Sequence, residues 1–74
     1  MSANADRLPT FRGTNYTHEV VVNGVRHALT ESLDEAKIVA RAISRVTSLS
    51  QEVRIYAAFS ALPHSSYRAG RVVT

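Results

Sequence analysis

Three histidines, His18, His27 and His64, are the first residues in this 74-residue sequence whose chemistry suggests a function. Imidazole groups bind metals and titrate near neutral pH. The pattern of the sequence places His18 and His27 on one face of a predicted hairpin. However, no cysteine is present and no carboxylate stands beside them at the spacing of a metal site. We therefore interpret the histidines as structural or solvent-edge residues and predict no metal and no other cofactor.

Nucleophilic catalysis would need a serine, a base and an orienting acid brought together by the fold. His64, Ser65 and Ser66 are adjacent in sequence, but they lie in a predicted turn without a glycine-rich elbow or an oxyanion-hole loop. The phosphate-binding patterns GxGxxG and GxxxxGK[ST] do not occur either. The sequence thus predicts a protein that is not an enzyme.

The charged residues give a stronger signal. The formal net charge is +3, and Lys37 is the only lysine among nine cationic residues, so the other eight are arginines. Arginine makes bidentate contacts with carboxylates and phosphates, and it stacks on flat groups. The bias favours an acidic partner, either protein or nucleic acid. The alternative is a GC-rich genome that encodes arginine in place of lysine, with all the charges solvated.

The segment from Ser32 to Leu49 has the clearest periodicity of the sequence. Ser32 and Glu35 have the spacing of a helix capping box, which predicts a helix that begins near residue 33. Lys37, Arg41 and Arg45 recur every four residues and would line one solvent-facing edge. The predicted buried stripe consists of Ala36, Val39, Ala40, Ile43 and Val46, widened by Ile38, Ala42 and Leu49.

A β-hairpin is predicted from Tyr16 to Thr30, where Asn23 and Gly24 separate two β-rich runs and favour a two-residue type I′ turn. The valine-rich face of this hairpin should pack under the helix. On the other face, Glu19 and Arg26 would form a diagonal exposed pair worth a few tenths of a kcal/mol. The predicted register pairs Val22 with Val25, Val21 with Arg26, Val20 with His27, Glu19 with Ala28 and His18 with Leu29.

Further strands are predicted after the helix. The residues from Glu52 to Leu62 alternate between apolar and mixed positions, which indicates a half-buried strand with Phe59 as the central core aromatic. Pro63 would end this strand, and residues 64–66 would form a polar turn. A short fourth strand is predicted from Tyr67 to Thr74.

The order of these elements predicts an α+β fold: a small single-layer antiparallel sheet, built from a hairpin and one or two later strands, with one helix packed on one face. We expect a flexible N-terminal arm at residues 1–15 and one domain at residues 16–74. No signal-like segment and no apolar run long enough to span a membrane is present. Together with the lack of cysteine, this predicts a cytoplasmic protein, complete as a small gene product and without a membrane partner.

The predicted partner-binding residues come from the arm, the helix and the later strands. In the arm, a basic and apolar cluster could become ordered against a partner, although Phe11 could instead pack on the domain edge or the arm could fray. The other cations could merge into one positive surface suited to a phosphate backbone. However, the sequence has no RNA-binding sheet motif, GxxG clamp or zinc finger. The full set is Arg7, Phe11, Arg12, Lys37, Arg41, Arg45, Arg54, Arg68 and Arg71.

In its size, its arginine-rich single domain, its lack of cysteine and its sheet-plus-helix layout, the whole chain resembles a family of small phage proteins. These are transcription regulators that lytic phages direct against the host RNA polymerase, particularly the type known from a Xanthomonas phage. The resemblance implies binding near the β′ N-terminal region and the β flap, displacement of the σ factor, inhibition of initiation and antitermination. It assigns no individual residue. We expect a monomer; the alternatives are a small basic nucleic-acid-binding protein and an accessory subunit.

Overall fold

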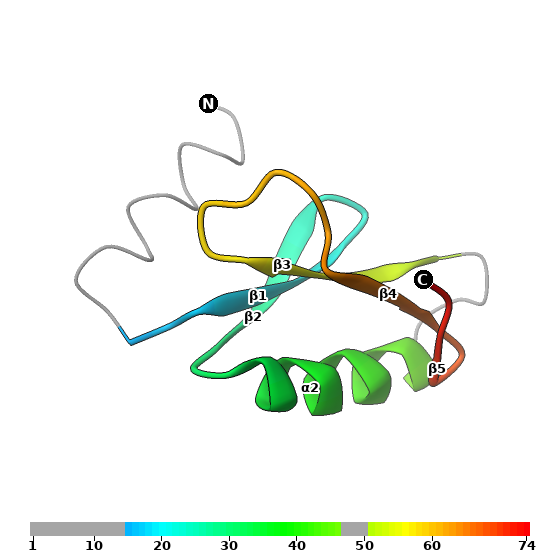
Figure 1. Cartoon of the computed structure of the whole chain (residues 1–74). Helices are drawn as coiled ribbons and strands as arrows, with labels where there is room; N and C mark the ends of the chain where they lie inside the picture. The colour runs from blue at the N-terminus through cyan, green and yellow to red at the C-terminus, as the bar shows by residue number, and fades with distance from the viewer. Residues whose placement is uncertain (1–14, 47–50) are drawn as a thin grey trace.

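The computed structural model describes residues 15–46 and 51–74. Its elements are β1 (His18–Val22), β2 (Val25–Thr30), α2 (Leu33–Val46), β3 (Val53–Ala57), β4 (Ser65–Arg68) and β5 (Arg71–Val72). The strands form one antiparallel sheet in the order β2-β1-β3-β4-β5, and α2 lies across one face of it (Figure 1). The predicted α+β fold is confirmed, with three strands after the helix where one or two were predicted.

The helix begins where its cap predicts. The backbone N–H of Glu35 donates to Ser32 Oγ at 3.1 Å, and the helix starts at Leu33. The Glu35 carboxylate accepts from the backbone N–H of Glu31 at 2.9 Å, one residue before the donor that the capping box predicts. Both bonds satisfy donors at the N-terminal end of the helix. The predicted helix end at Leu49 lies outside the described residues.

The core lies between the inner side of α2 and the face of the sheet beneath it. Ala36 and Ala40 are small, so the helix backbone can approach the sheet closely, and both are fully buried. The buried core cluster consists of Val20, Val22, Ala36, Ala40, Val53, Ile55 and Tyr67, with Ala28, Leu33, Val39 and Ile43 packed against it.

The predicted buried stripe is wrong at the outer side of the helix. Ile38 is 71% exposed and Val46 is 85% exposed, because a single sheet contacts only one side of α2. The buried inner position is taken by Ser44, whose Oγ donates to the Arg41 carbonyl at 2.9 Å and accepts from the Gly70 N–H at 2.8 Å. These two bonds satisfy the hydroxyl group, so a polar residue can occupy this buried site.

The β1–β2 hairpin has the predicted turn, and the predicted register is confirmed for the two pairs next to it, Val22 with Val25 and Val21 with Arg26. Asn23 and Gly24 both have positive φ angles, 52° and 77°, as a type I′ turn requires. A β-bulge follows, so that Val20 lies opposite Ala28 and His27 is the extra residue. Every pair beyond the bulge is therefore displaced by one residue from the prediction.

The prediction of Phe59 as the core aromatic is wrong. Strand β3 ends at Ala57, and Phe59 lies in a turn with a φ of 62° and an exposed fraction of 58%. The backbone N–H of Ala58 donates to the Thr17 carbonyl at 2.8 Å, which closes the strand pairing at this point. The buried aromatic of the core is Tyr67 on β4.

The predicted turn at residues 64–66 and the predicted strand from residue 67 are also wrong in detail. Ser65 and Ser66 are buried residues of β4, paired with β3. Ala69 and Gly70 have φ angles of 55° and 79° and form a tight turn that divides the predicted fourth strand into β4 and β5. Serines are frequent in turns, but here the ladder to β3 holds both of them in a strand.

The two turn glycines offer a matched stability test. Gly24→Ala places a Cβ in open space, so we expect only the cost of the positive φ, about 1 kcal/mol. Gly70→Ala should lower the free energy of unfolding further, because its Cβ would lie 2.8 Å from Arg45 Cγ and 2.9 Å from Arg45 Nε. Urea denaturation measures both losses. In an Arg45→Ala background, the additional loss of stability at Gly70 should disappear. Equal losses at the two glycines in the wild-type background would contradict the close packing of Arg45 against Gly70.

Candidate binding surfaces

The sheet divides the predicted cationic residues between two sides of the molecule. Side chains alternate along a strand, so Arg54 lies on the face opposite its buried neighbours Val53 and Ile55. Arg68 follows buried Tyr67 and lies on that same far face. Lys37, Arg41 and Arg45 instead belong to α2, on the covered side of the sheet. These five cations therefore form two groups and not one continuous surface.

Arg71 belongs to the group on the far face, because it pairs with Arg68 across the β4–β5 hairpin. The predicted arm residues Arg7, Phe11 and Arg12 lie outside the described residues.

Contacts with the sheet orient two cations of the helix. The Arg41 guanidinium lies over the ring of Tyr67, 5.9 Å from its centroid, a contact worth about 0.5–1 kcal/mol at an exposed site. The Arg45 side chain packs against the backbone of Gly70, where any larger residue would collide with it. The rest of both arginines is exposed. We call Lys37, Arg41 and Arg45 the cation row.

A row of exposed apolar side chains runs beside the cation row. Ile38, Ala42 and Val46 are spaced by four residues, and each directly follows a member of the cation row. Residues at this spacing share one face of a helix. We call this the outer apolar row, and the two rows together the helix ridge. The sequence predicted that this apolar row would be buried, because periodicity alone does not reveal which side of α2 the sheet covers.

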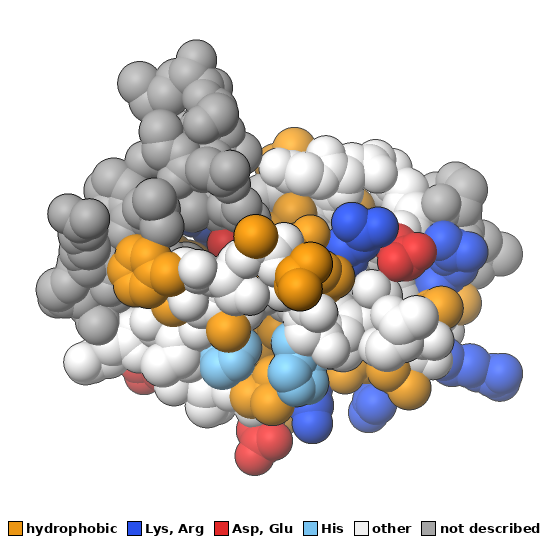
Figure 2. Space-filling view, turned by 45° about the horizontal axis from the view of Figure 1, so that its top comes forward, with side chains coloured by type: hydrophobic (Ala, Val, Ile, Leu, Met, Phe, Trp, Pro, Cys, Tyr) orange, Lys and Arg blue, Asp and Glu red, His pale blue; other side chains and the backbone are white. Residues whose placement is uncertain are grey.

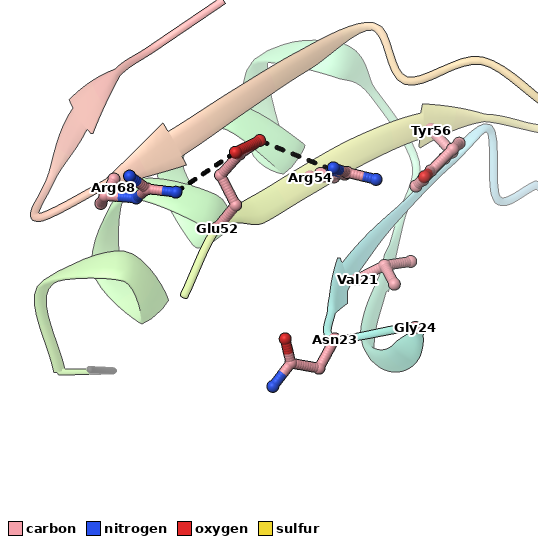
Figure 3. Close-up of a pocket in the computed structure, with 7 residues that line it drawn as sticks. All are labelled: Val21, Asn23, Gly24, Glu52, Arg54, Tyr56 and Arg68. Carbon is pink, nitrogen blue, oxygen red and sulfur yellow. Dashed lines mark hydrogen bonds and ion pairs between the residues drawn. The ribbon is translucent and has the colours of Figure 1, made fainter. Parts of the chain in front are cut away.

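The far face of the sheet carries a pocket of about 430 Å³. It is bounded by the β1–β2 turn on one side and by β3 and β4 on the other (Figure 3). The residues that line it are Val21, Asn23, Gly24, Glu52, Arg54, Tyr56 and Arg68. Of these residues, the sequence predicted only the two arginines for binding. Alternation along β3 also groups Tyr56 with Arg54, but no local pattern joins the hairpin residues to them.

One carboxylate joins the two arginines of this pocket. Glu52 lies between them (Figure 3), with Arg68 Nη2 3.3 Å from Oε1 and Arg54 Nε 3.6 Å from Oε2. The pKa of Arg54 is raised, chiefly by a hydrogen bond with Tyr56 and then by electrostatic interaction with Tyr56 and Glu52. Arg54 therefore remains a cation at every working pH, and the pocket presents two guanidinium groups to an anion.

A second ion pair on the far face has a structural role. Arg26 Nε lies 3.2 Å from Glu19 Oε1, as the hairpin predicted, but Glu19 is only 2% exposed. The prediction of an exposed pair is therefore wrong. A buried carboxylate needs a partner to compensate for lost hydration, so removing Arg26 should be costly.

The bulge makes His27 the extra residue of the hairpin, so it does not pair with Val20 as predicted, and His18 pairs with Thr30. The charge of His64 acts on His18. Histidine side chains lie on the surface shown in Figure 2, among apolar groups. Burial, and to a lesser extent the charge of His64, lowers the pKa of His18 below its ordinary value of 6.5. Among the described residues, no group of three or more histidine, aspartate or glutamate side chains could hold a metal ion.

Comparisons with protein families, with characterised proteins and with solved structures found no match to this chain. Within residues 15–46 and 51–74, no helix combines the length and apolar character needed to cross a membrane.

The pKa of His18 predicts how stability depends on pH. The unfolded chain binds this proton more readily than the folded protein, so the stability from His18 is present above pH 6.5 and is lost as pH falls through the lowered pKa. An NMR titration should give a pKa below 6.5. His64→Gln should raise it without restoring 6.5, because burial is the larger cause; a pKa at or above 6.5 in the wild-type protein would contradict this account.

Proposed function

We propose that this protein is a non-enzymatic, phage-encoded regulator that binds the host bacterial RNA polymerase. It inhibits initiation by hindering the engagement of σ factor and promoter, and it promotes antitermination. Its place of action is the host cytoplasm. The partner follows from the family that the sequence resembles, and the mode of binding follows from the helix ridge.

The observation that carries this proposal is the combination of apolar and cationic rows on the helix ridge. Stable protein interfaces have an apolar centre and a polar rim. On the ridge, Ile38 and Val46 can form the apolar centre, and the cation row can form the polar rim. A phosphate backbone attracts the cations but offers nothing to the apolar row. The ridge therefore fits an acidic protein surface with an apolar strip better than it fits nucleic acid.

The orientation of the cation row supports the same proposal. Ordering a long side chain on binding costs about 0.5–1.5 kcal/mol. Arg41 and Arg45 already rest on Tyr67 and Gly70, so part of that ordering has occurred in the free protein. The acidic residues of the helix, Asp34 and Glu35, lie in its first turn, so all the charges in the C-terminal part of the ridge are positive and steer an acidic partner there.

A pull-down from bacterial lysate treated with nuclease tests the partner. We expect the tagged protein to retain RNA polymerase subunits with σ depleted, as identified by mass spectrometry. A small nucleic-acid-binding protein would instead recover RNA or DNA before nuclease treatment and no polymerase after it. That second result would contradict the proposal.

Two double variants test the ridge with purified core polymerase. Ile38→Ser with Val46→Ser, and Arg41→Gln with Arg45→Gln, should each weaken binding about tenfold or more, which corresponds to about 1.4 kcal/mol. Arg54→Gln with Arg68→Gln removes the same charge from the far face and should change the affinity by less than about twofold. Circular dichroism checks that each variant is folded. Equal losses from both arginine pairs would show that general charge, and not the ridge, binds the polymerase.

A further inference from the structure

The pocket on the far face is separated by the sheet from the helix ridge, and the proposed function does not use it. Its lining combines two guanidinium groups, one aromatic ring and one carboxamide. We propose that this pocket binds a nucleotide, with the phosphate between Arg54 and Arg68 and the base against Tyr56. The nucleotide comes from one of two sources, a free mononucleotide or a single-stranded nucleic acid, which share this chemistry.

The charges of the pocket favour an anion. Arg54 and Arg68 line it, and Arg71 lies next to it in the β4–β5 ladder. The one acidic lining residue, Glu52, holds both arginines at 3.3 and 3.6 Å, whereas strong ion-pair hydrogen bonds measure about 2.7–2.9 Å. One carboxylate therefore bridges the two guanidinium groups loosely. A phosphate has more acceptor oxygens and would contact both groups in the place that Glu52 now occupies.

The aromatic and amide groups distinguish a nucleotide from a simple anion. Tyr56 lies two residues from Arg54 on the same face of β3, roughly 7 Å along the strand. A base can stack on such a ring while its phosphate contacts the neighbouring cation, which is how single-stranded nucleic acids are held on sheet surfaces. Asn23, across the pocket, carries both donor and acceptor groups for a base edge. An acidic peptide would use the arginines but not this combination.

The size of the pocket is consistent with this ligand. Its volume of about 430 Å³ falls within the roughly 300–1,000 Å³ of sites that take small molecules. Its lining includes Val21, a buried residue of β1, and Gly24 of the tight hairpin turn.

Two matched pairs of variants test the proposal by fluorescence anisotropy with labelled eight-residue oligo(dT) and oligo(rU). Tyr56→Leu should weaken binding about fivefold or more, whereas Tyr16→Leu, at a tyrosine outside the pocket, should change it by less than about twofold. Glu52→Gln should tighten binding several-fold, because it removes the competing carboxylate. Glu31→Gln makes the same charge change at an exposed residue outside the pocket and should have a much smaller effect.

Competition with UMP and with inorganic phosphate identifies the source. Displacement of the oligonucleotide by UMP at similar concentration indicates a free nucleotide, whereas binding of the oligomers alone indicates single strands; either result supports the proposal. The proposal is overturned if neither UMP nor the oligomers bind at millimolar concentration. It is also overturned if the two variants of the tyrosine pair, or of the glutamate pair, have the same effect. Binding of phosphate or of a hexaglutamate peptide as tightly as UMP and the oligomers would overturn it as well. Polymerase binding is measured separately, so failure here leaves the proposed function standing.

Discussion

The rest of the structure depends on one packing constraint: a single helix covers a single face of the sheet. Ala36 and Ala40 meet Val20, Val53 and Ile55 with no exposed surface left on any of them. This contact uses the inner side of α2 and one face of the strands, and a core this small leaves little apolar area in reserve. Both the outer side of the helix and the far face of the sheet are then left to carry side chains for other purposes.

The same packing orients the side chains that we assign to binding. Ser44 joins α2 to the β4–β5 turn through Gly70, and this brings Arg45 against the turn and Arg41 over the ring of Tyr67. On the far face, the alternation that buries one set of side chains turns the other set outward around the pocket. In the two proposals taken together, the sheet separates a protein-binding ridge from a nucleotide-binding pocket.

The sequence by itself determined the features that depend on neighbours a few residues apart. The Ser32–Glu35 spacing fixed the start of the helix, because its cap is a contact between residues in one turn. Asn23 and Gly24 fixed the hairpin turn, because both tolerate a positive φ. The order of these elements was sufficient for the α+β class, and charge periodicity was sufficient to place the cation row along one edge of the helix.

Only the tertiary structure decided which face each residue occupies. The bulge at His27 changed the hairpin register. Pairing with β3 places Ser65 in a strand, whereas Phe59 lies in a turn after the end of β3. The pocket needs residues from the hairpin turn, β3 and β4, and no local signal joins them. The physical reason is that an alternating or helical pattern gives the period of the side chains, whereas their phase against the core is set by pairing between strands distant in sequence.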